Sequence, residues 1–201
     1  MLEFKDVCMA RGGQTLFTRL SLIVRRGEML YVRGSKDSGK SSLIEAVMGL
    51  MPVTDGYITM EGELLTTYSA ATFRRLMAYV PQDLQLSEPT FAALFDRVVR
   101  LDVNRKSGLS KDTLWAFWST VNIDRSYYDM PFDRVDEPMR RMLMLSLACV
   151  LRRPLVLVDE SQHATEDVLL REMARQGSAV LVTGSRETGR GVYDKQITLE
   201  T

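Results

Sequence analysis

The chain of 201 residues has few of the residue types that build metal centres and disulfide frameworks. It contains one histidine and two cysteines, and Cys8 and Cys149 lie far apart without a Cys-x-x-Cys spacing. Zinc sites and disulfide-stabilised folds need several such residues at short, regular spacings. The sequence therefore argues against a zinc centre and predicts two reduced thiols in an apolar core.

A hydrophobic segment long enough to cross a bilayer is also missing. The longest apolar run covers residues 142–151, includes Ser146 and lies between two pairs of arginines. A transmembrane helix needs about 20 consecutive apolar residues, so this run predicts a buried helix. The chain turns polar directly after Met1-Leu2, which argues against an export signal. We therefore expect a cytoplasmic protein.

An excess of charge of one sign is absent as well. Lys plus Arg and Asp plus Glu each number 26, which gives a formal net charge of zero. This balance argues against nucleic acid or acidic lipid as a partner held by charge alone. Hydrophobic residues make up 45% and charged residues 26% of the chain, as in ordinary globular proteins. Its length predicts one domain over residues 1–201, with room for a small insertion.

Short apolar and β-branched runs alternate with segments of helical periodicity. The runs predict strands at residues 20–24, 29–32, 57–60, 77–80, 155–158, 179–183 and 196–199. The periodic segments predict helices at residues 41–50, 91–101, 113–120, 139–151 and 166–175. This alternation predicts an α/β fold with a mostly parallel sheet flanked by helices. Residues 83–141 contain no convincing strand and are expected to form an inserted helical subdomain.

The strongest functional signal is Gly34-Ser35-Lys36-Asp37-Ser38-Gly39-Lys40-Ser41, which matches GxxxxGK[ST] between an expected strand and an expected helix. In such a P-loop, backbone N–H groups and the helix N-terminus hold a polyphosphate. Lys40 would contact the β and γ oxygens, and the Ser41 hydroxyl would bind Mg²⁺. The alternative is a glycine-rich turn that only caps a helix. The predicted nucleotide-binding residues here are Gly34, Ser35, Lys36, Asp37, Ser38, Gly39, Lys40, Ser41 and Ser42.

A second carboxylate for the metal is expected at the end of the apolar segment 155–158, where Asp159 and Glu160 follow. Asp159 would hold Mg²⁺ through water, and Glu160 would polarise the attacking water. The alternative is an acidic strand end that only faces solvent.

With these motifs the chain resembles the ATP-binding cassette (ABC) family over nearly its whole length. Residues 2–7, 16–22 and 26–28 look like the antiparallel β-subdomain that precedes this family's P-loop. Ala78-Tyr79-Val80-Pro81-Gln82 looks like the Q-loop, where Gln82 would contact Mg²⁺ and couple the helical subdomain to the nucleotide. The resemblance implies a P-loop NTPase fold of ABC type, with ATP and Mg²⁺ as its ligands. It also implies Glu160 and Gln82 as catalytic residues and Ser41, Gln82 and Asp159 as metal ligands.

Three positions depart from the family pattern. The signature LSGGQ, which contacts the nucleotide of a second cassette, is replaced by Val135-Asp136-Glu137-Pro138-Met139. Gly184 stands where the switch histidine is expected, and Arg11 where an aromatic residue stacks on adenine. A guanidinium plane also stacks on a base, so Arg11 is expected to bind nucleotide. The first two departures imply slow hydrolysis and a weak nucleotide-dependent dimer.

Two further groups of residues have alternative interpretations. Trp115, Phe117 and Trp118 cluster in the insertion, and Leu114 and Trp118 share a helix face, which favours a subdomain core over a groove for a membrane subunit. The single histidine, His163, is expected to be an ordinary surface residue.

The sequence leaves two functions of different class. The first is the ATP-binding subunit of an ABC transporter-like complex, peripheral on the cytoplasmic face of the membrane, which couples MgATP binding and slow hydrolysis to movement of separate integral membrane subunits. A second cassette subunit, either the same chain or a different one, would complete it. The alternative is a nucleotide-binding scaffold or regulator with negligible ATP turnover.

Overall fold

The computed structural model describes residues 1–189 and 191–199. The chain forms two compact units, Met1–Gln82 with Arg153–Thr201, and Asp83–Arg152. The second unit is the expected helical insertion, but it continues to Arg152 rather than ending at residue 141. Its last helix, α5 (Glu137–Leu151), packs against α4 (Lys111–Thr120), and this contact sets the boundary.

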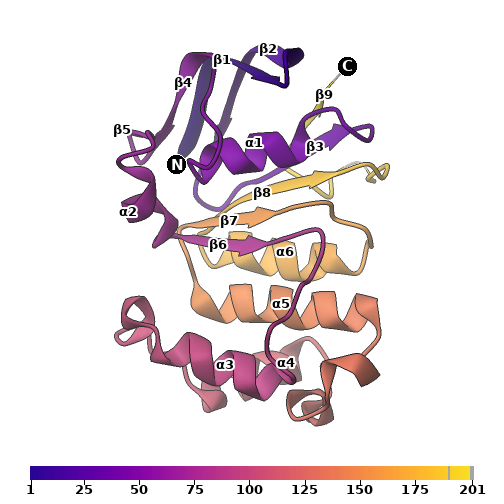
Figure 1. Ribbon diagram of the computed structural model, residues 1–201. Helices are drawn as coiled ribbons and strands as arrows, with labels where there is room; N and C mark the ends of the chain where they lie inside the picture. The colour runs from indigo at the N-terminus through magenta and orange to yellow at the C-terminus, as the bar shows by residue number, and fades with distance from the viewer. Residues whose placement is uncertain (190, 200–201) are drawn as a thin grey trace. The chain divides into compact units, whose positions relative to one another are not determined.

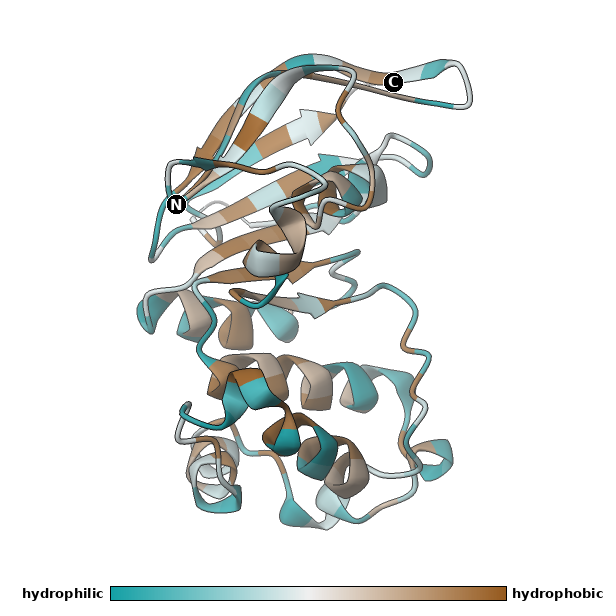
Figure 2. Cartoon of the chain, turned by 60° about the vertical axis from the view of Figure 1, so that its left-hand side comes forward, coloured by the Kyte–Doolittle hydropathy of each residue, from teal (hydrophilic) through white to brown (hydrophobic). Residues whose placement is uncertain are grey.

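The centre of the first unit is a five-stranded parallel sheet of order β6-β7-β8-β3-β9 (Figure 1). Its strands are β3 (Met29–Gly34), β6 (Met77–Val80), β7 (Leu155–Val158), β8 (Ala179–Gly184) and β9 (Lys195–Leu199). All residues of β7 and β8 are buried, which explains why Leu155–Val158 and residues 179–182 are apolar without interruption (Figure 2). Helices α1 (Lys40–Val47) and α6 (Glu166–Arg175) pack against β3 and β8 on opposite faces of the sheet (Figure 1).

A four-stranded antiparallel sheet of order β2-β1-β4-β5 belongs to the same unit. Its strands are β1 (Leu2–Arg11), β2 (Gln14–Val24), β4 (Asp55–Met60) and β5 (Glu63–Leu64). Leu2, Phe4, Val7 and Met9 of β1 are buried and share one apolar core with α1 and the parallel sheet. The predicted fold class, a parallel sheet with an antiparallel subdomain, is confirmed.

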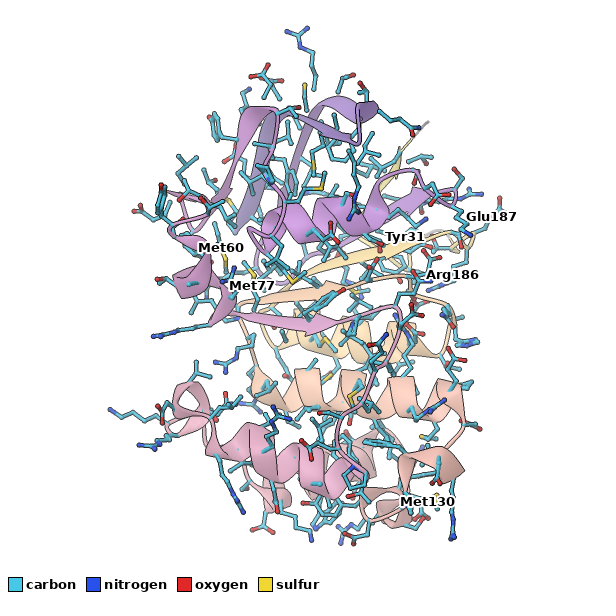
Figure 3. All side chains as sticks on the ribbon, viewed as in Figure 1. Tyr31, Met60, Met77, Met130, Arg186 and Glu187 are labelled. Carbon is cyan, nitrogen blue, oxygen red and sulfur yellow. The ribbon has the colours of Figure 1, made fainter. Side chains whose placement is uncertain are left out.

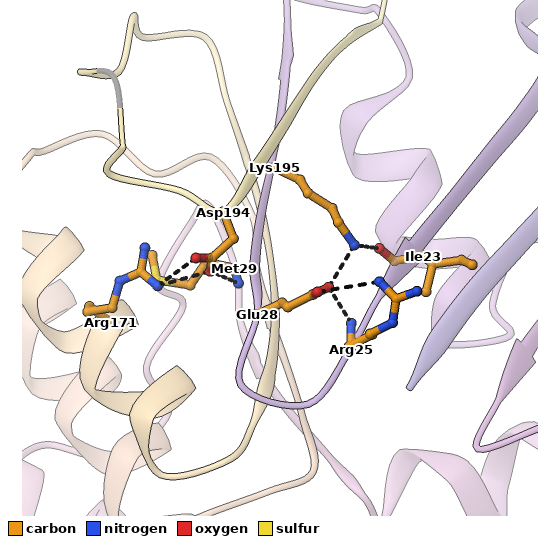
Figure 4. A network of polar contacts seen from close by, with 7 residues as sticks. All are labelled: Ile23, Arg25, Glu28, Met29, Arg171, Asp194 and Lys195. Carbon is orange, nitrogen blue, oxygen red and sulfur yellow. Dashed lines mark hydrogen bonds and ion pairs between the residues drawn. The ribbon is translucent and has the colours of Figure 1, made fainter.

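The edge strand β9 is fastened by a polar network shown in Figure 4. Lys195 Nζ donates to Glu28 Oε2 at 2.7 Å and to the Ile23 carbonyl at 2.9 Å. Asp194 accepts from the Met29 backbone N–H at 2.8 Å and pairs with Arg171 of α6. These contacts fix the start of β3, the strand that leads into the loop at residues 34–39.

The second unit contains α3 (Phe91–Arg100), α4, α5 and three short 3₁₀ turns, Asp102–Asn104, Arg125–Tyr128 and Phe132–Arg134. Leu114 and Trp118 of α4 are fully buried, and Trp118 Nε1 donates to Ser146 Oγ of α5 at 2.9 Å. The core interpretation of these two residues is confirmed. Trp115 is half-buried and packs on Tyr128 with a centroid distance of 4.8 Å.

Several helices and strands begin or end at other residues than the sequence predicts. Strands 77–80 and 155–158 and helix 166–175 are confirmed to the residue, whereas the helix expected at 41–50 ends at Val47. Gly49 follows with φ +65°, a left-handed conformation that stops a helix. Helix α2 (Ala70–Arg74) was not predicted, because five residues are too short for a periodic signal.

The remaining expectations concern membrane spans and single residues. Among the residues that the structure describes, none of the helices combines the length and apolarity needed to cross a bilayer. Both cysteines are free thiols, as expected, but only Cys149 is buried, whereas Cys8 is half-buried. His163 is an exposed residue, as expected.

Candidate functional site

Two glycines at the turn from β3 to α1 occupy positions where a side chain would clash or would strain the backbone. A Cβ atom on Gly34 would lie 2.1 Å from Ser38 Oγ, and Gly39 has a left-handed φ of +92° at the N-cap of α1. The Ser38 hydroxyl is buried and has no hydrogen-bond partner within the described part of the chain. The loop is therefore a tight turn that brings its backbone and Lys40 to the N-terminus of a helix.

Lys40 is the central cation of this turn. Its side chain is 8% exposed, and its Nζ donates to the carbonyls of Gly34 at 2.9 Å and Ser35 at 2.7 Å. It also lies 3.4 Å from Glu160 Oε2. Helix α1 has glycine as its N-cap and no acidic residue in its first turn, so its partial positive charge is not compensated locally. The turn therefore presents an ammonium group and a helix N-terminus to an anion.

A cavity of about 750 Å³ opens at this turn. Its volume is in the range of sites for small molecules. Its lining residues are Arg11, Gln14, Leu16, Lys36, Asp37, Gly39, Lys40, Ser41, Ser42, Gln82, Glu160 and Ser185. The structure therefore brings most of the predicted site residues together around one space. Gly34, Ser35, Ser38 and Asp159 do not line it: the first three shape the loop, and Asp159 is buried at the end of β7.

The acidic pair after β7 is organised by a residue that the sequence analysis did not identify. The Thr183 hydroxyl, on the neighbouring strand β8, donates to Asp159 Oδ1 at 2.8 Å and accepts the Glu160 backbone N–H at 3.0 Å. Glu160 itself has a positive φ of +51°, which is uncommon for a residue with a side chain and is found at functional sites. The signal for Thr183 was a hydroxyl residue near the carboxyl end of a strand, where α/β proteins place their ligands.

An aromatic ring occupies the space that the side chain of the expected switch histidine would need at residue 184. A Cβ atom on Gly184 would lie 2.3 Å from Tyr31 Oη and 2.9 Å from Tyr31 Cζ. Burial raises the pKa of Tyr31 to about 12, so its hydroxyl stays protonated and donates to the Arg186 carbonyl at 3.0 Å. Tyr31 and Arg186 point toward one another in Figure 3. Any side chain larger than glycine at residue 184 would require Tyr31 to move.

The segment after β8 is held by a second set of contacts. The Arg186 guanidinium pairs with Asp167 of α6, and the Tyr193 hydroxyl donates to the same carboxylate at 2.6 Å. Burial and the bond to Asp167 raise the pKa of Tyr193, and its ring lies 4.8 Å from that of Tyr31. These contacts join Arg186 and Tyr193 to α6, next to Ser185, which lines the cavity.

One wall of the cavity is formed by Arg11, Gln14 and Leu16. Arg11 Nη1 lies 3.4 Å from Ser42 Oγ and 3.5 Å from Glu45 Oε2, and the Arg11 side chain is 62% exposed. These contacts hold the guanidinium beside α1, while its exposure leaves a face open to a planar ring.

The donor set around the cavity fits a polyphosphate with a hard divalent cation. Lys40 and the N-terminus of α1 supply positive charge, and Ser41 and Gln82 supply oxygen atoms of the kind that Mg²⁺ prefers. Across residues 1–189 and 191–199, no cluster of three or more His, Cys, Asp or Glu residues could hold a metal alone.

The residues in place of the family signature form the beginning of α5 in the second unit. Asp136 is the N-cap residue, and its carboxylate accepts the Met139 backbone N–H at 2.8 Å. Glu137 and Pro138 lie in the first turn. This helix end therefore carries its own negative charge, in contrast to the uncapped N-terminus of α1.

Comparisons with known proteins show the family of this chain. A family model described as ABC transporter matches residues 17–163. The hemin import ATP-binding protein HmuV of Streptomyces coelicolor is 28% identical over 182 residues, which cover 85% of this chain and 64% of that protein. The cytochrome c biogenesis ATP-binding export protein CcmA of Pseudomonas putida is 26% identical over 193 residues, or 90% of this chain and 88% of that protein.

Some relatives are longer, and this chain spans only 38% of a probable ABC transporter ATP-binding/permease protein of Haemophilus influenzae. Among solved structures, the ATP binding subunit of an ABC transporter superposes with a TM-score of 0.80 at 23% identity, covering 99% of this chain and 85% of that one. Clostridium perfringens cbiO1, part of the complex cbiONQ, gives a TM-score of 0.79 at 15% identity over 99% and 84% of the two chains. With its P-loop, acidic strand end and antiparallel subdomain, the chain belongs to the ABC transporter family.

Proposed function

We propose that the chain is the ATP-binding subunit of a membrane transport complex, in which MgATP binding and slow hydrolysis move separate membrane subunits. The observation that carries this proposal is Lys40 at the uncapped N-terminus of α1, facing a cavity of about 750 Å³ with Glu160 on its edge. Similarity to the hemin import ATP-binding protein HmuV and the cytochrome c biogenesis ATP-binding export protein CcmA supports it.

The roles of the residues follow from their present contacts. Lys40 would exchange the carbonyls of Gly34 and Ser35 for β and γ phosphate oxygens, since it has the reach and the charge. Bound Mg²⁺ supplies charge neutralisation on the phosphates, with Ser41, Gln82 and, through water, Asp159 as its protein ligands. Glu160 would orient a water molecule and accept its proton. Arg11 would stack on the base.

A groove within the second unit supports a protein partner. It has a volume of about 440 Å³ and is lined by Leu84, Leu86, Glu88, Pro89, Pro131, Phe132, Asp133 and Arg140. We assign it to a segment of an integral membrane subunit. The proposal then places the chain as one domain, peripheral on the cytoplasmic face of the membrane, together with a second cassette subunit of the same or a different kind.

Lys40→Ala tests the nucleotide site. Loss of the ammonium group removes charge-assisted hydrogen bonds worth about 1.5 to 3 kcal/mol, so the Kd for MgATP is expected to rise about ten- to a hundredfold. Titration with a fluorescent ATP analogue measures this change. Lys106→Ala, at an exposed lysine of the second unit, is the matched control and should bind as the unmodified chain does. Equal affinity of both variants, or no binding to the unmodified chain at millimolar nucleotide, would refute the nucleotide-binding proposal.

Leu84→Asp combined with Leu86→Asp tests the groove. Two carboxylates added to the groove would have to be desolvated when a partner binds there, so co-purification of integral membrane proteins from native membranes is expected to be lost. Leu101→Asp with Val103→Asp is the matched control, because these side chains are 48% and 42% exposed and do not line the groove. MgATP binding should remain in both. Co-purification that survives in the groove variant would place the membrane contact elsewhere.

A scaffold or regulator with negligible turnover is the second candidate function. Gly184 lacks an imidazole, and Tyr31 fills the space that one would need. The acidic residues at the start of α5 also favour this second function. The hydrolysis measurements described in the Discussion separate the two candidates.

A further inference from the structure

The Glu160 carboxylate is held by an unusual pair of donors. Its Oε1 accepts both the backbone N–H of Ser185 at 2.8 Å and the Ser185 hydroxyl at 2.7 Å. Its other oxygen, Oε2, lies 3.4 Å from Lys40 Nζ. Ser185, which directly follows β8, thus donates two hydrogen bonds to one oxygen of the carboxylate. The second oxygen receives no hydrogen bond from Ser185, and Glu160 and Ser185 both line the cavity.

The position of Ser185 is determined from two sides. On the β8 side, Thr183 bonds Asp159 and Glu160 through its hydroxyl, and its carbonyl accepts the Ser161 N–H at 2.7 Å. On the other side, Tyr31 holds the carbonyl of Arg186, whose guanidinium pairs with Asp167. Ser185 lies between these anchors, so its hydroxyl is already placed before any ligand binds.

Packing alone gives no reason for a serine hydroxyl at this position. Ser185 is exposed, and its side chain fills no part of the buried core. The hydroxyl instead selects one rotamer of Glu160, a residue that also carries a strained backbone at φ +51°. A flexible carboxylate is a poor general base, because catalytic groups must be held close to their reactive geometry.

We propose that Ser185 is the positioning residue for Glu160 and stabilises its catalytic rotamer in a site without a histidine at residue 184. This inference rests on the proposed ATPase function. Hydrogen bonds from Ser185 to Oε1 leave Oε2 to accept a proton from water, while the water oxygen bonds to the γ-phosphorus and the β–γ bridging oxygen departs with ADP. Nucleotide would draw Lys40 toward its phosphates, which frees Oε2 for this proton.

The test compares Ser185→Ala with Ser185→Thr, which keeps the hydroxyl, and with Ser119→Ala, a matched control at an exposed serine of α4. The backbone donor of residue 185 remains in each variant. We expect Ser185→Ala to lower kcat about tenfold, since one hydrogen bond to a charged acceptor is lost. KM and the Kd of a fluorescent ATP analogue should stay unchanged. Ser185→Thr should restore kcat, and Ser119→Ala should match the unmodified chain.

Two results would overturn the assignment. One is an unchanged or higher kcat in Ser185→Ala, and the other is a parallel loss of kcat and nucleotide affinity that threonine does not rescue. If Ser185→Ala fails to fold, Ser185→Cys keeps the volume with a weaker donor and gives the same comparison. Failure of the proposed function is distinguishable, because the unmodified chain would then either not bind the ATP analogue or hydrolyse ATP no faster than Glu160→Gln.

Discussion

Glu160→Gln is expected to lower the rate of ATP hydrolysis by about 10²- to 10⁴-fold, the usual contribution of a general base. Glutamine keeps the size of the side chain and an oxygen that can accept from Ser185, but it cannot take a proton from water. Because Lys40 and the helix N-terminus remain, affinity for MgATP should be retained. Phosphate release at saturating MgATP, together with titration of the fluorescent analogue, measures both quantities.

Glu187→Gln is the matched control for this change. Glu187 is two residues beyond Ser185, its side chain is 84% exposed, and it pairs with Arg33 instead of lining the cavity. Its substitution should leave the rate unchanged. A brisk rate that is insensitive to Glu160→Gln would show that another group orients the water. A rate of the unmodified chain already at the level of Glu160→Gln would favour the scaffold function.

Removing the charges at the start of α5 is expected to strengthen MgATP-dependent self-association by about 10³-fold. In a family-type dimer this helix end faces the γ-phosphate bound by the other subunit, so Asp136 and Glu137 would oppose a like charge. One such pair at about 4 Å costs about 4 kcal/mol at an effective dielectric constant of about 20, which corresponds to the stated factor. We therefore expect the Glu160→Gln chain to stay monomeric with MgATP.

Asp136→Asn with Glu137→Gln, in the Glu160→Gln background, tests the effect of the two negative charges alone on self-association. Asparagine is as good an N-cap residue as aspartate, so the bond to the Met139 N–H is kept and the helix should not change. The control carries Asp102→Asn with Asp112→Asn, two exposed acids of the same unit that alter net charge equally. Light scattering with and without MgATP measures the mass. A tight ATP-dependent dimer of the chain with Asp136 and Glu137 intact would show that other groups neutralise their negative charge.

Residues 83–152 show how much of the fold can be predicted from local sequence patterns. Apolar periodicity located α3 and most of α5, since an amphipathic helix repeats its signal over several turns. The end of this unit was misplaced at residue 141, because assignment of α5 to it depends on packing against α4, a contact between segments distant in the chain. A periodic pattern says that a helix has a buried face, but it does not say against which partner.

What the sequence determined by itself is the phosphate-binding turn and the acidic strand end. Each is a contiguous segment in which strand, loop and helix signals adjoin, so the residues that act together are also neighbours in the chain. The three-dimensional arrangement alone decided the surroundings of Glu160. Thr183 of β8 and Ser185 of the turn after it bond to Glu160 at the end of β7, and Tyr31 of β3 bonds to Arg186 after β8. These contacts form only because the strand order is β7-β8-β3. Hydrogen bonds and steric exclusion act over a few ångströms. Tyr31 therefore excludes a side chain at residue 184, and Ser185 bonds to Glu160, only once the sheet has formed.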